Sequence, residues 1–425
     1  MNKPLHHAIY QKVNWRLLPI LFSAYIFAYL DRINVSFAKL QMLSDLKFSE
    51  TIYGLGAGVF FIGYTLVEIP SNILLNKYGA RRWIARILIS WGIISIAMIW
   101  VKTPTMFYLL RFLLGVAEAG FFPGIIYYLS RWYPEYYRGR IYTVFMTAVA
   151  VSGIIGGPVS GAILNYMADT GGLHGWQWLF ILEAAPAVLI GIFIIFYLDD
   201  NINAANWLNS TEKEILLTNL APPKDMPKAH IPSLQLLKNR NLWRLALIYF
   251  CLSTGLYGVG FWLPTIIKSY GVKSDFSIGL LSALPYLLAM VSMLLLGKSS
   301  DRCNERIYHL SITVALAACS LIVLLTIKSN LFLSILCLSI ANAGIISSIA
   351  LFWTLPTREF NGVTAAIGIA FINSCGNIAG FVAPYLFGLL KDLYGSIIGG
   401  MHYIISMLFI GCLLILLNKF IKKST

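Results

Sequence analysis

Long apolar segments recur along the whole chain, and they limit its possible folds more than any other feature. Each segment is close to the ~20 residues that a helix needs to cross the hydrocarbon core of a bilayer. The segments are continuously apolar and do not alternate, which favours transmembrane helices over a β-barrel. The sequence predicts twelve spans, at residues 14–38, 52–76, 83–101, 105–129, 141–168, 176–198, 243–267, 276–297, 307–327, 331–354, 362–388 and 398–418.

The composition agrees with a membrane protein that carries out no chemistry on its ligand. The 425 residues are 58% hydrophobic and 12% charged, whereas soluble domains carry about 25% charged residues. The six cysteines form no Cys-x-x-Cys pair, so we expect no disulfide framework and no metal site. The sequence lacks Gly-x-Ser-x-Gly, His-Glu-x-x-His and phosphate-binding motifs, and the predicted loops are too short for a catalytic domain. We expect neither enzymatic activity nor a cofactor.

The basic residues predict how the helices are oriented. With the N-terminus in the cytoplasm, 23 of the 32 Lys and Arg residues fall on the cytoplasmic side and seven fall outside. The other two, Arg32 and Arg111, lie within spans. This asymmetry follows the positive-inside rule and predicts that both termini are cytoplasmic. The formal net charge of +14 therefore indicates a lipid-bilayer partner, and no nucleic-acid partner is expected.

One long polar connection divides the spans six and six, and landmarks in the first six recur in the last six. These pairs are the loops 76–81 and 301–306, Pro158 and Pro384, and the loops 134–139 and 356–362. A parallel repeat of six helices predicts two bundles with a substrate site between them. We place the N-terminal bundle at residues 1–198, the cytoplasmic linker at 199–241 and the C-terminal bundle at 242–425.

Several motifs resemble those of a known family of transporters. Residues 297–302, with Arg306, resemble the loop signature of the major facilitator superfamily. Residues 29–36, 61–64 with 68–72, and 111–120 resemble its anion:cation symporter family, which includes organic-anion/H⁺ symporters of the galactonate, tartrate and hydroxyphenylacetate permease type. The resemblance implies an all-α fold of twelve transmembrane helices in two pseudo-symmetric bundles. It also implies a multi-pass protein of the bacterial cytoplasmic membrane that works as a monomer.

Ionisable residues within or beside the spans are the strongest functional signal, because each costs ~2.5–3.5 kcal/mol at a helix centre. They are Asp31, Arg32, Glu68, Arg111, Glu118 and Glu183. Arg111 and Glu118 are seven residues apart, so two helical turns place them on one face about 10 Å apart along the axis. Gly115 lies between them, which predicts room for a ligand. The alternative is a structural ion pair, either Asp31 with Arg111 or Glu118 with Arg32.

The charges of Asp31, Arg32, Arg111 and Glu118 predict a coupling mechanism. With both acids ionised the four charges cancel, and the carboxylates can occupy the arginines. With both acids protonated the site carries +2, and two planar guanidinium groups are free to bind a carboxylate. Proton binding would therefore favour anion binding, and linkage requires the reverse as well.

The resemblance also implies a role for particular residues. Asp31 and Glu118 would be the proton-coupling acids, and Arg32 and Arg111 would contact the substrate. Further substrate contacts are expected from Tyr64, Trp353, Asn373 and, as our own extension by one helical turn, Asn377. Aromatic packing is the alternative for Tyr64 and Trp353. Interhelical hydrogen bonding is the alternative for the two asparagines.

Three features qualify this interpretation. Ala350 and Phe352 stand where sugar-acid transporters of this family tend to have hydroxyl side chains, which favours a smaller or more apolar carboxylate. Glu68, beside Pro70, is expected at a helix end in a structural or gating role, and Glu183 is expected to reach the outer surface. The glycines and proline of the fifth span resemble an antiporter motif, although we favour close helix packing; they are Gly153, Gly157, Pro158 and Gly161.

The sequence therefore predicts a proton-coupled secondary transporter that imports a small organic anion, a carboxylate, by alternating access. The coupling ion is H⁺, with Na⁺ as the alternative. The other candidate function is an anion exchanger or a proton-driven efflux antiporter. A channel or a receptor is disfavoured because the two matched halves are typical of alternating access.

Overall fold

The computed structural model describes residues 3–220, 238–327, 330–359 and 362–423, and these residues are helical with short connections. Twelve helical segments in these ranges are long and apolar enough to cross a membrane. They confirm the twelve predicted spans to within a few residues at most ends, although the first helix extends further on both sides of residues 14–38. Part of the predicted linker, residues 221–237, lies outside the described residues.

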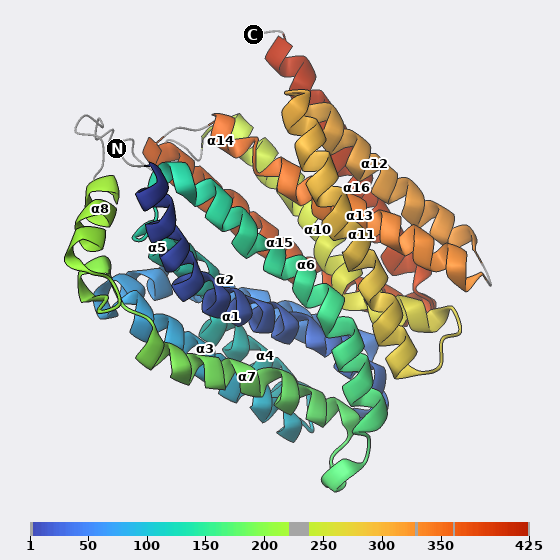
Figure 1. Ribbon diagram of the computed structural model, residues 1–425. Helices are drawn as coiled ribbons and strands as arrows, with labels where there is room; N and C mark the ends of the chain where they lie inside the picture. Colours follow the sequence, from blue (N-terminus) through green and yellow to red (C-terminus); the bar gives the residue numbers. More distant parts are fainter. Residues whose placement is uncertain (1–2, 221–237, 328–329, 360–361, 424–425) are drawn as a thin grey trace.

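The helices form two groups that lie side by side (Figure 1). We call these groups the N-half and the C-half. The N-half consists of α1 (Lys3–Leu46), α2 (Glu50–Tyr78), α3 (Ala80–Ile96) with the 3-10 turn η1 (Ala97–Trp100), α4 (Pro104–Glu118), α5 (Phe121–Ser130), α6 (Glu135–Tyr166) and α7 (Gly175–Tyr197). The connection after α7 contains η3 (Ile202–Ala204) and α8 (Ser210–Leu220). The C-half consists of α10 (Arg240–Ser269), α11 (Asp275–Arg302), α12 (Ile307–Thr326), α13 (Leu331–Phe352), α14 (Pro356–Glu359), α15 (Gly362–Tyr394) and α16 (Ile398–Lys423).

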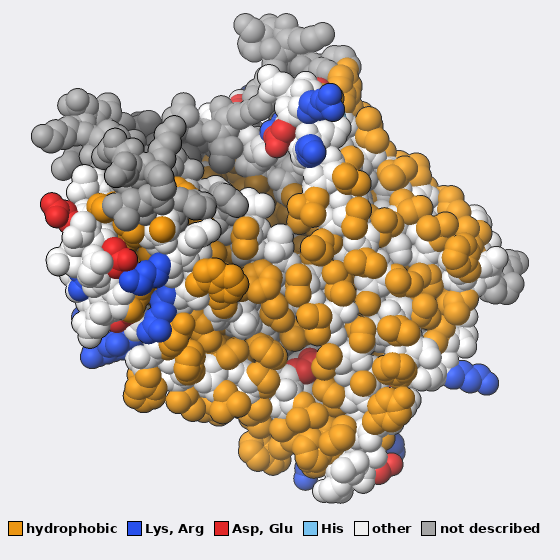
Figure 2. Space-filling model, viewed as in Figure 1, with side chains coloured by type: hydrophobic (Ala, Val, Ile, Leu, Met, Phe, Trp, Pro, Cys, Tyr) orange, Lys and Arg blue, Asp and Glu red, His pale blue; other side chains and the backbone are white. Residues whose placement is uncertain are grey.

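The outer surface is suited to lipid. Hydrophobic side chains cover the middle of the face shown in Figure 2, and most charged side chains lie toward its ends. Large apolar residues such as Leu66, Phe196 and Phe332 are among the most exposed side chains. A soluble protein would bury such residues, whereas a bilayer solvates them.

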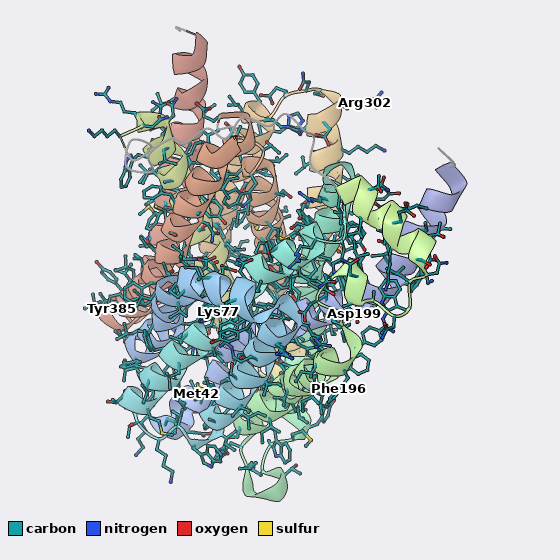
Figure 3. All side chains as sticks on the ribbon, turned by 90° about the vertical axis from the view of Figure 1, so that its left-hand side faces the viewer. Met42, Lys77, Phe196, Asp199, Arg302 and Tyr385 are labelled. Atoms are coloured by element: carbon teal, nitrogen blue, oxygen red, sulfur yellow. The ribbon has the colours of Figure 1, made fainter. Side chains whose placement is uncertain are left out.

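The two halves carry their short connecting loops at matching places. Lys77 lies at the end of α2 and Arg302 at the end of α11, and both are labelled in Figure 3. After α2, the backbone N–H of Arg81 donates to Asp200 at 2.9 Å. After α11, Arg306 forms an ion pair with Asp301. An arginine beside a carboxylate therefore stabilises the loop in both halves.

The fourth span is a broken helix, which the sequence analysis missed. α4 ends at Glu118 and α5 begins at Phe121, because Gly120 has a left-handed backbone with φ of 84°. The Ala119 carbonyl oxygen at the break accepts a hydrogen bond from the Ser71 hydroxyl at 2.6 Å. The sequence feature that could have predicted this break is Gly120 followed three residues later by Pro123, because glycine often ends a helix and proline is tolerated in the first turn of the next one.

The halves meet most closely where glycines replace side chains. In the crossing of α6 with α11, a Cβ atom on Gly157 would lie 2.5 Å from the Gly279 carbonyl oxygen. A Cβ atom on Gly161 would lie 2.6 Å from the Asp275 carbonyl oxygen. α2 packs against α15 in the same way, with Gly58 against the Phe381 backbone. The glycines of the fifth span therefore serve close helix packing, as the favoured interpretation predicted.

This crossing gives a direct prediction for stability. Replacing Gly157 with alanine is expected to lower the stability by about 1–3 kcal/mol, because the added methyl group has to push the two backbones apart. The measurement is the thermal unfolding temperature of the purified protein in detergent. Gly139→Ala is the matched control on α6, since nothing lies within 4 Å of its Cβ position. Equal unfolding temperatures for the two variants would contradict the close crossing.

Polar contacts between the halves gather at the end of the molecule that contains residues 47–49 and 270–274, which we call the far end. The opposite end, where α1 begins and α16 ends, is the terminal end (Figure 1). At the far end Gln41 donates to Asp275 at 2.7 Å. Asp392 on α15 accepts from the backbone N–H of Thr51 at 2.7 Å and so caps the first turn of α2 across the interface. The far end is therefore closed in this conformation.

Candidate functional site

An ion pair between α1 and α4 lies at the centre of the candidate site. An Nη atom of Arg32 donates to Oε1 of Glu118, and the Glu118 side chain is almost fully buried. The Arg32 side chain keeps 19% of its surface exposed. Its guanidinium also lies 5.5 Å from the centre of the Tyr64 ring and 5.4 Å from that of Phe60. This is one of the two ion pairs that the sequence analysis gave as a structural alternative.

Arg111 is buried but lacks a matching acceptor. None of its surface is exposed. Nε donates to the Gly56 carbonyl oxygen at 3.3 Å, while Nη1 and Nη2 have no hydrogen-bond partner among the described residues. The guanidinium also faces Phe60, with 5.1 Å to the ring centre. A buried cation with unsatisfied donors is costly, so this arrangement favours an anionic ligand.

Asp31 does not form the ion pair with Arg111 that was considered. Its Oδ1 atom accepts hydrogen bonds from the Ser95 hydroxyl and from the Asn34 side-chain amide, the latter at 3.1 Å. Asp31 lies within electrostatic reach of Arg111 but beyond ion-pair distance. The prediction that both arginines are occupied by carboxylates is therefore wrong for Arg111. Neutral donors stabilise the buried Asp31 carboxyl group instead.

Glu183 corrects a second expectation. It was expected to reach the outer surface, yet it is 2% exposed and its Oε1 atom accepts from the Ser160 hydroxyl at 2.6 Å. Glu183 also lies within electrostatic reach of Asp31. The two acids thus belong to one buried polar cluster between α1, α6 and α7. The signal in the sequence was the hydroxyl and amide residues on the neighbouring spans, which can hydrogen-bond a buried carboxyl group.

Two smaller corrections concern α2. Glu68 is not at a helix end, because α2 continues through Pro70 to Tyr78. It is half-buried and lies within electrostatic reach of Arg32. The predicted space beside Gly115 is also filled, since a Cβ atom there would lie 2.9 Å from the Tyr64 backbone nitrogen. Gly115 therefore brings α2 against α4, and no ligand fits beside it.

The predicted C-half residues lie on α15 and at the end of α13. Trp353 is half-buried, with its ring 4.8 Å from that of Tyr249. Asn373 is half-buried, and Asn377 is 7% exposed with its Nδ2 atom lacking a hydrogen-bond partner among the described residues. The described hydrogen bonds and ion pairs join neither asparagine to the arginines. The structure thus brings the N-half residues together, whereas the hydrogen bonds and ion pairs of the described residues link neither Asn373 nor Asn377 to them.

Tyrosines from both halves lie within electrostatic reach of Arg32, and of these only Tyr64 was predicted from the sequence. Tyr25 on α1 and Tyr257 on α10 both lie within electrostatic reach of Arg32. Tyr249, which packs against Trp353, lies within electrostatic reach of the same two tyrosines. Tyr25 was detectable, since it precedes Arg32 by two helical turns and shares its face. Tyr257 was not, because only the packing of the halves brings α10 to α1.

The described residues contain no group of three or more His, Cys, Asp or Glu that could hold a metal ion. The charged groups at the site are two guanidinium groups and the carboxyl groups near them. Such a set can bind an anion and exchange protons. It contains no nucleophile paired with a base.

Comparison with known proteins agrees with the helical architecture. The sequence profile of the Major Facilitator Superfamily matches residues 21–384. The chain is 44% identical to a "Putative metabolite transport protein NicT" of Pseudomonas putida, over 96% of this chain and 94% of that protein. It is 43% identical to a "Putative tartrate transporter" of Agrobacterium vitis, over 98% and 96% of the two chains. A "Quinolone resistance transporter" of Acinetobacter baumannii is 42% identical, over 96% and 94%.

Solved structures share the fold. A crystal structure of a bacterial homologue of the human lysosomal transporter Spinster, in an inward-facing and unoccupied conformation, superposes with a TM-score of 0.75. The match covers 98% of this chain and 97% of that one, at 15% sequence identity. This similarity concerns the arrangement of the helices.

Proposed function

The chain belongs to the Major Facilitator Superfamily, and from this premise we propose that it imports a small organic carboxylate together with protons. It is a transporter, a multi-pass protein of the cell membrane, and its family indicates no enzymatic activity. The observation that carries the proposal is the buried guanidinium of Arg111, whose two terminal nitrogens have no hydrogen-bond partner among the described residues. A carboxylate supplies two acceptors at the spacing of these donors.

The Arg32–Glu118 ion pair supports proton coupling. While Glu118 is ionised it holds Arg32. Protonation of Glu118 removes its charge and releases Arg32, which then faces the substrate together with Arg111. Because the ligand and the Glu118 carboxylate compete for the same guanidinium, substrate binding favours protonation in return. Asp31, near Arg111, is the second proposed proton-coupling acid.

The conformation fits one step of an alternating-access cycle. The far end is closed by contacts between the halves, and the positive-inside rule places the terminal end in the cytoplasm. We assign this conformation to the inward-facing state. Import then requires the far-end contacts to break and the halves to rock about the central site.

The residues around the arginines favour a compact anion over a larger sugar acid. Aromatic rings of Phe60 and Tyr64 lie beside Arg32, and Tyr25 and Tyr257 lie within electrostatic reach of it. Phe352 is fully buried against Tyr249, with ring centres 5.1 Å apart, so it offers no hydroxyl group to a sugar acid. Two arginines suit a small dicarboxylate, and the relative described as a tartrate transporter makes tartrate the first probe.

Uptake into proteoliposomes tests the function. An inside-alkaline gradient of one pH unit is expected to drive about tenfold accumulation for each proton that accompanies the carboxylate, because one pH unit is equivalent to about 1.4 kcal/mol. A protonophore is expected to abolish the accumulation. Radiolabelled tartrate, with a panel of other small carboxylates as competitors, is the measurement.

The second candidate is exchange or efflux, which the similarity to a quinolone resistance transporter favours. An exchanger would show uptake only when substrate is present inside the vesicles, whatever the pH gradient. A proton-driven antiporter would expel substrate when the gradient is applied. Either result would replace the symport proposal.

A further inference from the structure

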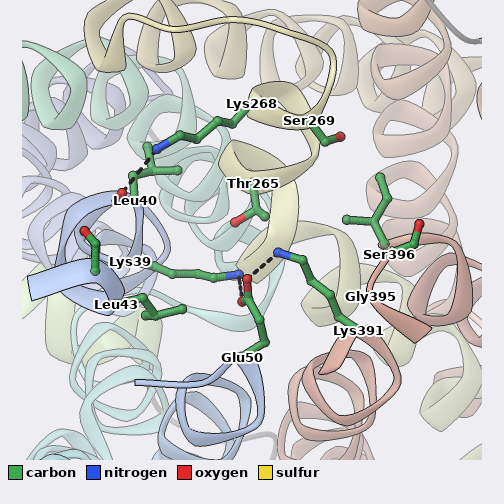
Figure 4. Close-up of a pocket in the computed structure, with 12 residues that line it drawn as sticks. Lys39, Leu40, Leu43, Glu50, Thr265, Lys268, Ser269, Lys391, Gly395 and Ser396 are labelled. Carbon is green, nitrogen blue, oxygen red and sulfur yellow. Dashed lines mark hydrogen bonds and ion pairs between the residues drawn. The ribbon is translucent and has the colours of Figure 1, made fainter. Parts of the chain in front are cut away.

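A pocket of about 500 Å³ lies at the far end, between the two halves. Its walls come from α1 and α2 of the N-half, α10 and α15 of the C-half, and the turn after α15 (Figure 4). The polar lining includes Lys39, Glu50, Thr265, Lys268, Lys391 and Ser396. None of these residues belongs to the central site.

Basic side chains dominate this pocket. Three of the seven Lys and Arg residues that the topology places outside converge here, although the positive-inside rule disfavours basic residues on that side. Glu50 is the only acid in the lining that the structure describes. The lining therefore carries an excess of two positive charges. Asp392 lies outside the lining and accepts hydrogen bonds from the first turn of α2. If its negative charge is included, the excess is one positive charge.

The three lysines differ in how they are held. Lys39 is 4% exposed; its Nζ atom lies 2.6 Å from Glu50 Oε2 and 3.3 Å from the centre of the Trp262 ring. Lys391 forms an ion pair with the other oxygen of Glu50. Lys268 is exposed at the rim and donates to the Leu40 carbonyl oxygen at 3.2 Å. Lys268 thus has no acid partner within ion-pair distance among the described residues.

A buried hydroxyl group in the same wall also lacks a partner. Thr265 is 9% exposed, and its Oγ1 atom makes no hydrogen bond among the described residues. A helical threonine usually donates to the carbonyl oxygen four residues earlier, here that of Phe261. That oxygen instead accepts from the Tyr53 hydroxyl at 2.8 Å. Figure 4 shows Thr265 in the pocket between Lys268 and Lys39.

We propose that this pocket is a second anion site, which takes a small organic carboxylate that reaches the protein from the far side. The Thr265 hydroxyl and the Lys268 ammonium supply unused donors, and Lys39 and Lys391 provide the positive field around them. The existence of an anion site follows from this pocket alone. The choice of a carboxylate as the anion rests on the proposed function.

Occupancy of this site would also affect the transport cycle. The lysines of the pocket come from both halves, Lys39 from α1 and Lys268 and Lys391 from α10 and α15, so a bound anion is attracted to both halves at once. A ligand that binds only the closed arrangement shifts the population toward it. Tartrate outside is therefore expected to oppose opening of the far end, and uptake should decline at high external tartrate concentrations.

The test is a tartrate titration of the thermal unfolding temperature of the full chain in detergent, at constant ionic strength set with sodium chloride. In an Arg111→Lys background, which removes the central site, tartrate should still stabilise in a saturable manner. Adding Lys268→Gln should weaken the apparent affinity by about tenfold, because a charge-assisted contact is lost. Thr265→Val should weaken it as well. Lys273→Gln, an exposed lysine at the same end outside the pocket, is the matched control and should change nothing.

Several outcomes would overturn the site. These are the absence of saturable stabilisation in the Arg111→Lys protein, equal affinities for Lys268→Gln and Lys273→Gln, or equal stabilisation by the neutral analogue erythritol. If Arg111→Lys does not fold, the same titration is made in the wild-type chain, where Lys268→Gln should remove the weaker of two phases. Failure of the proposed function has a different result. Uptake would then be independent of the pH gradient, while stabilisation by tartrate would still depend on Lys268.

Discussion

Proton-driven uptake of the substrate carboxylate is expected to fall about a hundredfold when Arg111 is replaced by lysine. Lysine keeps the charge but replaces a planar fork with a single ammonium group. The terminal nitrogens of Arg111, which have no hydrogen-bond partner among the described residues, would each donate to one carboxylate oxygen. Losing this bidentate contact costs about 3 kcal/mol, which corresponds to about a hundredfold at low substrate concentration. The measurement is initial uptake into proteoliposomes, normalised to inserted protein.

Arg86→Lys is the matched control for this variant. Arg86 lies on α3, where its guanidinium is 4.0 Å from the centre of the Trp83 ring. No hydrogen bond or ion pair of the described residues joins it to the central site. We expect it to keep uptake within about twofold of the wild type, as is usual for a substitution away from such features. If Arg111→Lys transported as well as Arg86→Lys, the central guanidinium would not be the substrate receptor.

The second large effect is expected from Glu118→Gln, which should weaken gradient-driven accumulation of the substrate while substrate exchange is kept. Glutamine resembles the protonated acid, so Arg32 would be free at every pH. Substrate exchange across the membrane should continue, whereas accumulation driven by one pH unit should fall about tenfold, because the proton that Glu118 carries is lost while Asp31 can still carry one. Paired assays of counterflow and gradient-driven uptake on the same vesicles measure the two activities.

Glu68→Gln provides the comparison. Glu68 is half-buried on α2 and within electrostatic reach of Arg32, but the described contacts give it no ion pair with that residue. It should retain gradient-driven accumulation. Unchanged accumulation in Glu118→Gln would assign coupling to Asp31 alone, and an equal fall in Glu68→Gln would show a general electrostatic effect with no specific carrier residue.

The fold was predictable because transmembrane hydropathy is a local property. A run such as residues 176–198 is apolar enough to identify a span without knowing its neighbours, and twelve such runs define the architecture. The Arg32–Glu118 pair was also accessible, because charges within spans are costly and require partners. These inferences depend on composition along the chain, which the sequence contains directly.

The remaining features depend on which way a helix faces and on what it meets. Glu183 was expected at the outer surface because the sequence shows its position along the span but not that its side chain faces Ser160. The lysine pocket was missed because Lys39, Lys268 and Lys391 come from three distant segments and converge only when the halves pack. The same holds for Tyr257, which reaches Arg32 from the other half.

The crossing of α6 with α11 has a mechanical consequence. Gly157 and Gly279 bring main chain against main chain there. Two helices that touch through glycine backbone can change their relative orientation with little repacking of side chains at the point of contact. The crossing can thus act as a pivot between the halves. The barrier to reorientation is then determined mainly by the polar contacts at the closed far end.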